Sequence, residues 1–416
     1  MADTAKVREI ASAIRERIEK VHIGCFQGME QPLFLISSTY PGVWLEHVYD
    51  SLFYARLTGD WSLAKNTLTL FIDRQTEKGQ FPCYVWDPAR AGGSGKNLVG
   101  YSQTQECVSF AELCLEYVRG SGDSAFLPKA YAASAAWENW YRENRMTTGR
   151  GLVEMFVGYD TGHDNSGRLL GMSCPGNYVH EDGRRENAAV LPPEDGVTPI
   201  LAVDMNCNFY ATETALAEMA DALDKPLEAA AWREKAKDVK KRLFDLCYDE
   251  KDAFFYDVDK HNEKRRVLSS TILHLFLEKV LDPEDDKALI RTLLDRHILN
   301  PKEFWTAYPF PSVAVSDPTS REHVPANSWG YFSEGLIALR ATRWMDDYGL
   351  SKEFDLLAER WVDAWTRCFD EIKLAQELDP MTGLPSPSSE WYSSNMLFYL
   401  YAAERLGYSS PAFGER

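Results

Sequence analysis

Apolar residues recur every three or four positions through most of the chain, the spacing of amphipathic helices. Val7, Ile10 and Ile14 begin the first such segment. Only residues 254–259, with the sequence FFYDVD, suggest a short strand or loop. The pattern predicts twelve helices, at 4–21, 46–58, 61–77, 102–118, 124–143, 202–222, 226–246, 267–279, 284–296, 327–347, 351–370 and 391–405.

Two turns between these helices share the pattern G-D-x-x-[LF], beginning at Gly59 and Gly122. They indicate a loose internal repeat of helical hairpins, in which Asp60 would cap the third helix. Six such hairpins can close into a ring that buries the apolar faces of its inner helices and gathers the long loops at one end. We therefore predict that residues 1–416 form one all-α domain, an (α/α)6 barrel or six-hairpin toroid.

The region 144–201 interrupts this pattern, because it is long, rich in glycine and proline and without an apolar period. Such a stretch inside a compact domain is usually functional or disordered. Its segment 154–168, EMFVGYDTGHDNSGR, places three carboxylates, a histidine, an asparagine and an arginine among three glycines. Locally this could be a surface turn or a loop that carries an active site.

Composition narrows the possible partners. The 416 residues include 12 Trp and 20 Tyr, which have flat side chains suited to stacking on sugar rings, and the net charge is -18. This charge opposes binding to phosphate backbones and to anionic membranes. We expect a small carbohydrate as the partner, without nucleic acid or membrane, and the oligomeric state stays open.

The remaining sequence signals point to a cytoplasmic protein. The eight cysteines form no C-x-x-C pair, which predicts buried thiols with neither disulfides nor a metal site. No apolar run approaches the ~20 residues of a membrane span, and the N-terminal segment lacks the apolar core of a secretory signal. No phosphate-binding loop or dinucleotide fingerprint is present, so we expect no cofactor.

Four loop segments are similar to motifs of one enzyme family. They are WLEHVYDSLFYA (44–55) beside W-x-W-D-S-x-F-x-A, TQEC (104–107) beside T-Q-P-P, YDTGHDNSGR (159–168) beside S-G-M-D-N-S-P-R, and QELDPMTG (376–383) beside E-x-Y-N-P-x-T-G. Together they resemble the inverting glycoside hydrolases of family 63, which are related to trehalases and include bacterial mannosylglycerate and glucosylglycerate hydrolases. The matches extend along nearly the whole chain.

This resemblance implies a role for individual residues. It places Asp164 on the general acid and Glu377 on the general base, and it implies no obligatory cofactor. Asp50 corresponds to the sugar-binding aspartate of the family's W-D-S motif, and Gln105 corresponds to the glutamine of its T-Q-P-P motif. The sequence departs from the family where W-D-S becomes Y-D-S and where G-P-V-W is replaced by VPANSWGY at 324–331. These departures leave the substrate subsites open.

Inverting hydrolysis needs two carboxyl groups about 6.5–9.5 Å apart, one protonated to assist the leaving oxygen and one ionised to activate water. Asp164 should therefore lie where desolvation or neighbouring acids raise its pKa, and Asp160, Glu154 and Asp50 are candidates for such neighbours. Glu390 is the alternative base.

Several other residues have both a functional and a structural interpretation. The tryptophans could stack on sugars or pack in the core, Arg168 could bind a substrate carboxylate or pair with an acidic neighbour, and the role of His163 stays open. The expected substrate-binding residues are Trp44, Asp50, Gln105, Asn165, Arg168, Trp329 and Trp391.

The predicted function is hydrolysis of a small α-glucoside or α-mannoside, including a glycosylglycerate. The loop at 144–201 and the segment Trp305–Trp329 should close over the site and form a pocket. One alternative is a sugar 2-epimerase or isomerase, which would use paired histidines such as His47, His163, His180 and His323. Another is a non-catalytic carbohydrate-binding relative.

Overall fold

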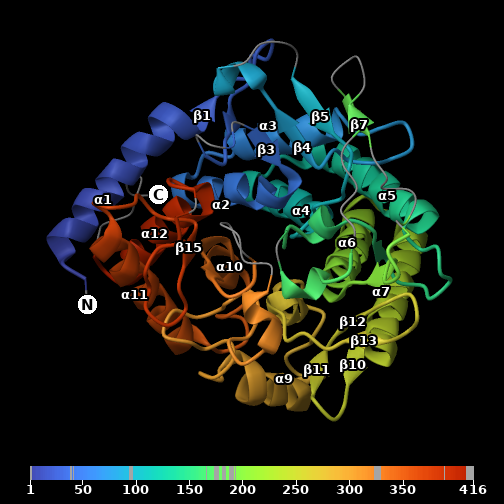
Figure 1. The fold of residues 1–416 in the computed structure, drawn as a ribbon. Coiled ribbons are helices and arrows are strands. Elements are labelled where there is room, and N and C mark those ends of the chain that lie inside the picture. The colour runs from blue at the N-terminus through green and yellow to red at the C-terminus, as the bar shows by residue number, and fades with distance from the viewer. Residues whose placement is uncertain are drawn as a thin grey trace.

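Helices dominate the structure, a computed structural model that describes residues 2–37, 40, 42–92, 97–164, 166–172, 178–179, 184–186, 192, 194–322, 329–387 and 389–408. In Figure 1 the chain passes around a ring of helices, and α12 ends beside α1. The prediction of a mostly helical protein is confirmed.

Each of the twelve predicted segments overlaps one α-helix of the described chain. These are α1 (Thr4–Arg17), α2 (Val48–Thr58), α3 (Ser62–Ile72), α4 (Phe110–Ser121), α5 (Leu127–Asn144), α6 (Val203–Ala222), α7 (Pro226–Cys247), α8 (His274–Leu277), α9 (Lys287–Leu293), α10 (Gly335–Arg340), α11 (Ser351–Cys368) and α12 (Ser393–Arg405). Several of these α-helices are shorter than predicted, because a 3-10 or π turn takes the place of α-helix at one end of the predicted segment.

Two predicted helix starts were wrong by more than a turn even when adjoining 3-10 turns are counted. The fourth helix begins at Phe110 and not near 102, because Thr104 and Gln105 use backbone and side-chain groups to bind neighbouring loops. The tenth helix begins at Gly335 and not near 327, because Ser333–Glu334 forms a strand immediately before it.

Buried faces explain why these segments are helical. On α11 the residues at helical spacing, Phe354, Leu357, Trp361 and Trp365, are all at most 1% exposed. The two repeated turns also occur as predicted. Gly59 and Gly122 end α2 and α4 in the left-handed conformation, with φ of 76° and 72°, which a residue with a Cβ rarely adopts.

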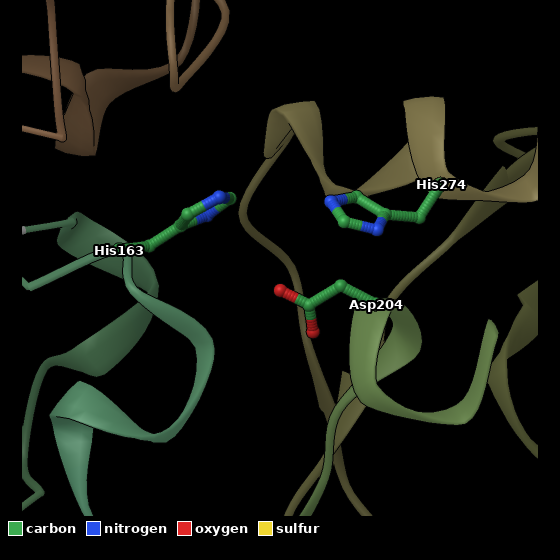
Figure 2. Close-up of side chains that lie close together, drawn as sticks. All are labelled: His163, Asp204 and His274. Carbon is green, nitrogen blue, oxygen red and sulfur yellow. The ribbon is translucent and has the colours of Figure 1, made fainter. Parts of the chain in front are cut away.

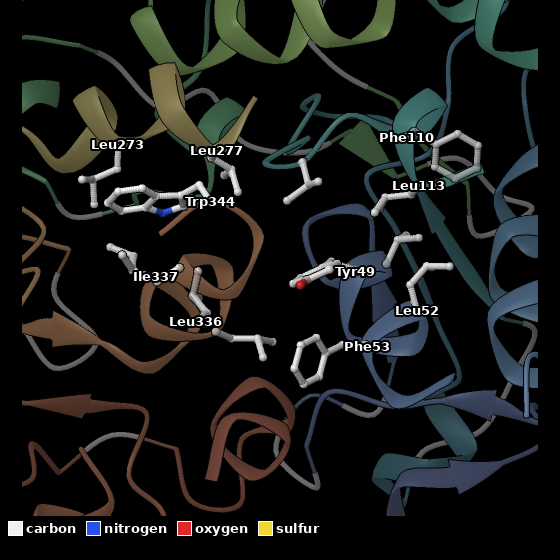
Figure 3. Packing of buried hydrophobic residues seen from close by; sticks show 14 of the residues in the cluster. Tyr49, Leu52, Phe53, Phe110, Leu113, Leu273, Leu277, Leu336, Ile337 and Trp344 are labelled. Carbon is white, nitrogen blue, oxygen red and sulfur yellow. The ribbon is translucent and has the colours of Figure 1, made fainter. Parts of the chain in front are cut away.

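The helices form an inner and an outer set. In Figure 1, α2, α4, α6, α10 and α12 lie around the centre, and α1, α3, α5, α7, α9 and α11 lie outside them. Successive inner helices pack on one another from α10 through α12, α2, α4 and α6 to α8. The ring core is apolar, and Figure 3 shows Tyr49 and Leu52 of α2 with Leu113 of α4, Leu277 of α8 and Leu336 of α10.

Short strands connect the helices, so the expectation of almost no strand was wrong. A five-stranded sheet has the order β3 (Gly42–Trp44), β4 (Tyr84–Trp86), β5 (Leu98–Gly100), β8 (Arg184–Glu186) and β7 (Tyr178–Val179). A four-stranded sheet has the order β13 (Lys264–Arg265), β12 (Asp257–Val258), β9 (Ile200–Leu201) and β6 (Glu154–Met155). Strands of two or three residues are too short to show an alternating sequence pattern.

Three further strand pairs are antiparallel. They are β1 (Ile23–Gly24) with β2 (Leu33–Phe34), β10 (Tyr248–Asp249) with β11 (Phe254–Phe255), and β14 (Ser333–Glu334) with β15 (Glu377–Leu378). The strands β11 and β12 fall within the predicted segment 254–259.

The cysteines that the structure describes are free thiols. Cys83, Cys107, Cys114, Cys207, Cys247 and Cys368 are buried, as predicted, whereas Cys25 is exposed. Cys174 lies outside the described residues.

Asp160 joins the loops that precede two inner helices. Its fully buried carboxylate accepts hydrogen bonds from the backbone N–H groups of Thr104, Phe156 and Val157, at 2.9 Å each. The guanidinium of Arg145, at the end of α5, pairs with the same carboxylate at 2.6 Å. Asp160 therefore holds the 104–107 segment against the 154–164 segment, and it is unavailable as a charge directed at Asp164.

We expect Asp160→Asn to lower the free energy of unfolding by about 3–5 kcal/mol, because it leaves the buried Arg145 guanidinium without its countercharge. Chemical denaturation of the two proteins measures the difference. Asp73→Asn is the matched control, because its ion pair with Lys129 is about half exposed on both sides and should contribute little. Equal effects of the two substitutions would contradict a structural role for Asp160.

Candidate active site

One cavity gathers residues from segments far apart in the sequence. It holds about 430 Å³ of space, part of which is open to solvent. Several lining residues lie shortly before the first residue of α2, α4, α10 or α12. The cavity therefore lies at the end of the inner helices where their N-termini are found. Its lining consists of Ile36, Tyr40, Trp44, Glu46, His47, Gln105, Gly162, Asp164, Trp329, Gln376 and Tyr392.

Asp164 presents a carboxyl group to this cavity with the properties of a proton donor. Its Oδ1 atom is buried and has no hydrogen-bond partner in the described part of the chain. Burial raises the pKa of Asp164 well above its ordinary value, and the nearby charge of Glu46 raises it further. A carboxyl group in this setting keeps its proton at a pH where an exposed aspartate would have lost it.

Glu46 is a cavity residue to which sequence reasoning gave no role. Its Oε2 accepts a hydrogen bond from Gln105 Nε2 at 3.1 Å, and Arg340 Nη2 lies 3.5 Å from its Oε1. Burial raises the pKa of Glu46, while Arg340 and Gln105 oppose that rise. Glu46 lies in the segment 44–55, but the motif resemblance of that segment indicated Asp50 as the sugar-binding residue.

The loop that carries Asp164 approaches Glu46 closely. Gly162 has φ of 76°, and a Cβ at this position would lie 2.8 Å from Glu46 Oε1. Only glycine therefore fits without displacing the carboxylate. This contact explains why the expected crowding of Asp164 comes from Glu46. Glu154, which was expected to contribute, instead accepts hydrogen bonds from Thr147 and Thr148.

Asp50 does not line the cavity, contrary to the expectation that it contacts the sugar. It lies inside α2, is 3% exposed and accepts hydrogen bonds from the hydroxyl groups of Ser393 and Ser394. Burial raises the pKa of Asp50 to about 6. Its partners make it a link between α2 and the first turn of α12.

The segment expected to supply the base places Gln376, and not Glu377, at the cavity. Glu377 is fully buried, faces Glu334 across the β14–β15 pair and accepts a hydrogen bond from Ser386 Oγ at 2.5 Å. The motif leads to the same residue. In E-x-Y-N-P the glutamate stands four positions before the proline, and that position before Pro380 is Gln376.

The alternative base lies elsewhere. Glu390 is exposed and its Oε1 accepts a hydrogen bond from the backbone N–H of Lys373 at 3.0 Å. It is not among the lining residues, so it has no access to a substrate in this cavity.

Two of the three candidate tryptophans line the cavity. Trp44 packs against Tyr84 at 5.5 Å between ring centroids, and Trp329 stacks on His163 at 4.4 Å. Trp391 instead packs against Phe369 outside the cavity. Gln105 lines the cavity as expected, and Asn165 lies outside the described residues.

Arg168 is occupied by its own acidic neighbours. Its guanidinium is 1% exposed and makes ion pairs with Asp204, at 2.6 Å, and with Asp257, at 2.8 Å. Of the two interpretations of this arginine, the structure supports pairing within the protein, and Arg168 is not among the lining residues.

His163, Asp204 and His274 form a buried cluster whose ligand atoms lie within 4.8 Å of one another, and their side chains converge in Figure 2. Burial lowers the pKa of His163 well below its ordinary value and that of His274 to about 4, so both are neutral. Both oxygens of Asp204 already bind Arg168. A metal ion would have to share that carboxylate with a guanidinium, so the cluster does not fit a metal.

The epimerase alternative would require two histidines facing the substrate. Among the lining residues that the structure describes, His47 is the single histidine, and its Nε2 lies 2.5 Å from Tyr392 Oη. Burial lowers the pKa of His47 to about 3. His180 and His323 lie outside the described residues. No observation on the described chain favours an epimerase.

An aromatic-walled cavity with two carboxyl groups is the kind of site that glycoside hydrolases use. The sequence comparison defines the family. The mannosylglycerate hydrolase MGH1-like glycoside hydrolase domain matches residues 40–329, more than half of the chain, and the protein belongs to this family. No curated protein matches the sequence.

Solved structures share the fold at low sequence identity. The mannosylglycerate hydrolase of family 63 from Thermus thermophilus, in complex with Tris, is 18% identical with a TM-score of 0.66, covering 95% of this chain and 99% of that one. Neutral trehalase Nth1 from Saccharomyces cerevisiae is 15% identical with a TM-score of 0.66, covering 97% of this chain and 80% of that one. In the described part of the chain, no helix has the length and apolar character to cross a membrane.

We expect Arg168→Ala to lower the free energy of unfolding by about 3–5 kcal/mol, because Asp204 and Asp257 would be left buried without a countercharge. Denaturation curves measure this loss, and KM for an anionic and a neutral glycoside should change by the same factor. Arg321→Ala is the control, because Arg321 is exposed and stacks on Tyr331. A selective rise in KM for the anionic glycoside at unchanged stability would show instead that Arg168 binds substrate.

Proposed function

We propose that the protein hydrolyses a small α-glucoside or α-mannoside with inversion at the anomeric carbon, in a single (α/α)6-barrel domain, with Asp164 as the general acid. The observation that carries this proposal is the carboxyl group of Asp164, which lines the cavity without a hydrogen-bond partner for Oδ1 in the described chain. An oxygen in that position is available to donate a proton to a glycosidic oxygen.

The electrostatic setting of Asp164 supports this role. General acids of glycosidases keep their proton because burial or a neighbouring negative charge raises the pKa. Both causes act on Asp164, burial first and Glu46 second. The proton is then available when the C–O bond breaks, and the departing oxygen leaves as a hydroxyl group.

The cavity walls support a sugar as the substrate. Trp44 and Trp329 offer flat apolar faces of the kind that stack on a pyranose ring, and Gln105 and Gln376 offer amide groups to its hydroxyls. A concave cavity with these walls suits one sugar ring and a small aglycone.

Glycerate is the first aglycone to test. One of the similar solved structures is the mannosylglycerate hydrolase from Thermus thermophilus in complex with Tris and D-glycerate. That likeness, at 17% identity, makes glycosylglycerates a reasonable substrate class for this chain and fixes neither the sugar nor the linkage.

Asp164→Asn should reduce hydrolysis of an alkyl α-glycoside by about 10²–10⁴-fold, because the amide cannot donate the proton that the leaving oxygen needs. The corresponding α-glycosyl fluoride should lose much less, since fluoride departs without protonation. In the wild-type enzyme kcat/KM for the alkyl glycoside should fall as the pH rises through the raised pKa of Asp164. Equal losses on the two substrates would argue against an acid role for Asp164.

The substrate class is tested by a screen of α-glucosides and α-mannosides, including glycerate conjugates and disaccharides, beside long α-glucans. We expect hydrolysis of the small glycosides, with the β-anomer as the first product in the NMR spectrum. Faster cleavage of internal bonds in a glucan would contradict a site for small glycosides. A product of retained configuration would contradict the inverting mechanism.

A further inference from the structure

We propose that Glu46 is the general base of this site, and that Gln376 holds the water molecule from which Glu46 takes a proton. This inference rests on the proposed glycosidase activity and completes its mechanism. It departs from the motif resemblance, which placed the base in the segment 376–383.

The first argument is access. Inverting hydrolysis requires a second carboxyl group beside the acid. Among the described residues that line the cavity, Glu46 and Asp164 are the carboxyl-bearing side chains. Glu377 is fully buried behind the wall with Ser386, Glu390 is at the surface, and Asp50 is bound to two serine hydroxyls.

The second argument is the different surroundings of the two carboxyl groups. Burial raises the pKa of Glu46, but the Arg340 guanidinium beside Oε1 and the Gln105 amide on Oε2 oppose that rise and favour the ionised form. Asp164 has no such partner at Oδ1 in the described chain, and the negative charge of Glu46 favours its protonated form. A pair in which one group is ionised and the other protonated is the arrangement that acid–base hydrolysis needs.

The third argument concerns Gln376. Its backbone is fixed, because its carbonyl accepts from Gly335 N at 3.0 Å and its N–H donates to the Ser389 carbonyl at 3.1 Å. The side chain is 3% exposed and lines the cavity. A carboxamide can donate and accept hydrogen bonds but does not take up a proton at neutral pH, so Gln376 can orient water and cannot activate it.

The resulting step balances in protons and electrons. A water oxygen forms a bond to the anomeric carbon while one of its protons passes to the Glu46 carboxylate. The bond from the anomeric carbon to the glycosidic oxygen breaks, and that oxygen takes the proton of Asp164. Both carboxyl groups then return to their starting states by proton exchange with solvent.

The test compares Glu46→Gln, Glu46→Ala and Glu377→Gln on the full chain, with an α-glycoside cleaved by the wild-type enzyme and with its glycosyl fluoride. We expect both Glu46 variants to lose about 10²–10⁴-fold on both substrates, because the base is needed whatever the leaving group. Glu377→Gln should keep activity within about tenfold. Sodium azide, a nucleophile that needs no deprotonation, should restore turnover to Glu46→Ala and give the β-glycosyl azide.

The outcomes separate this inference from the proposed function. If Asp164→Asn loses activity on the alkyl glycoside while Glu46→Gln does not, Asp164 remains the acid and Glu46 is not the base. A rise in KM at unchanged kcat, without azide rescue, would make Glu46 a sugar-binding residue and overturn the proposal. Failure of the wild-type enzyme to cleave any small α-glycoside would overturn the proposed function itself.

Two further variants are needed. One tests Glu46 if the alanine variant does not fold, and the other tests whether the wild-type cavity has a base at all. Glu46→Asp keeps a carboxylate near Arg340 but withdraws it by one methylene, so a folded variant with reduced kcat supports the proposal even if Glu46→Ala does not fold. Gln376→Glu places a carboxylate where the motif has one. An increase of about tenfold or more in kcat for this variant would show that the wild-type cavity lacks an effective base, and that Glu46 does not serve as one.

Discussion

The cavity depends on the buried ion pair between Arg145 and Asp160. Both side chains are fully buried, and the Asp160 carboxylate also accepts three backbone N–H groups. Because one of these belongs to Thr104, the loop of Gln105 is fixed against the loop that continues to Gly162 and Asp164. A loop cannot hold two facing side chains at a constant separation by its own stiffness. Here a charge that cannot leave the interior without great cost provides the constraint.

A second set of buried ion pairs fixes the part of the loop that follows Asp164. Arg168 binds Asp204, in the first turn of α6, and Asp257, on β12. His163, five residues before Arg168, stacks on Trp329, and Trp329 lines the cavity. Among the described residues of the 154–168 segment, Asp160 and Arg168 thus fix the loop, and Asp164 lines the cavity. A polar segment rich in glycine looks catalytic throughout in sequence, although two of its charged residues, Asp160 and Arg168, are neutralised by ion pairs within the protein.

The helices were predictable from sequence because helical periodicity accumulates over many residues, as in α11, and because the glycines that end α2 and α4 adopt a conformation that other residues avoid. The strands were not predictable, because a strand of two or three residues is too short to show the alternation of apolar and polar positions. The site was predictable to the level of its loops and not always of its residues. Asp50 and Glu46 stand one helical turn apart, and only the structure shows that the former binds Ser393 and Ser394 while the latter reaches the cavity.

The distinction between Gln376 and Glu377 has a simple geometric cause. Successive side chains of an extended segment point to opposite faces, so a shift of one residue exchanges the cavity for the interior. In the interior, Glu377 lies opposite Glu334, whose pKa is raised well above its ordinary value by burial and then by the charges of Glu377, Glu46 and Asp164. Arg340 is the positive charge that opposes the rise in the pKa of Glu334, and one guanidinium cannot keep Glu334 and all of these neighbouring carboxyl groups ionised. An amide at position 376 adds no further negative charge to this group, so the pKa of Glu46, which burial raises, is not raised further from that position, while Arg340 opposes the rise.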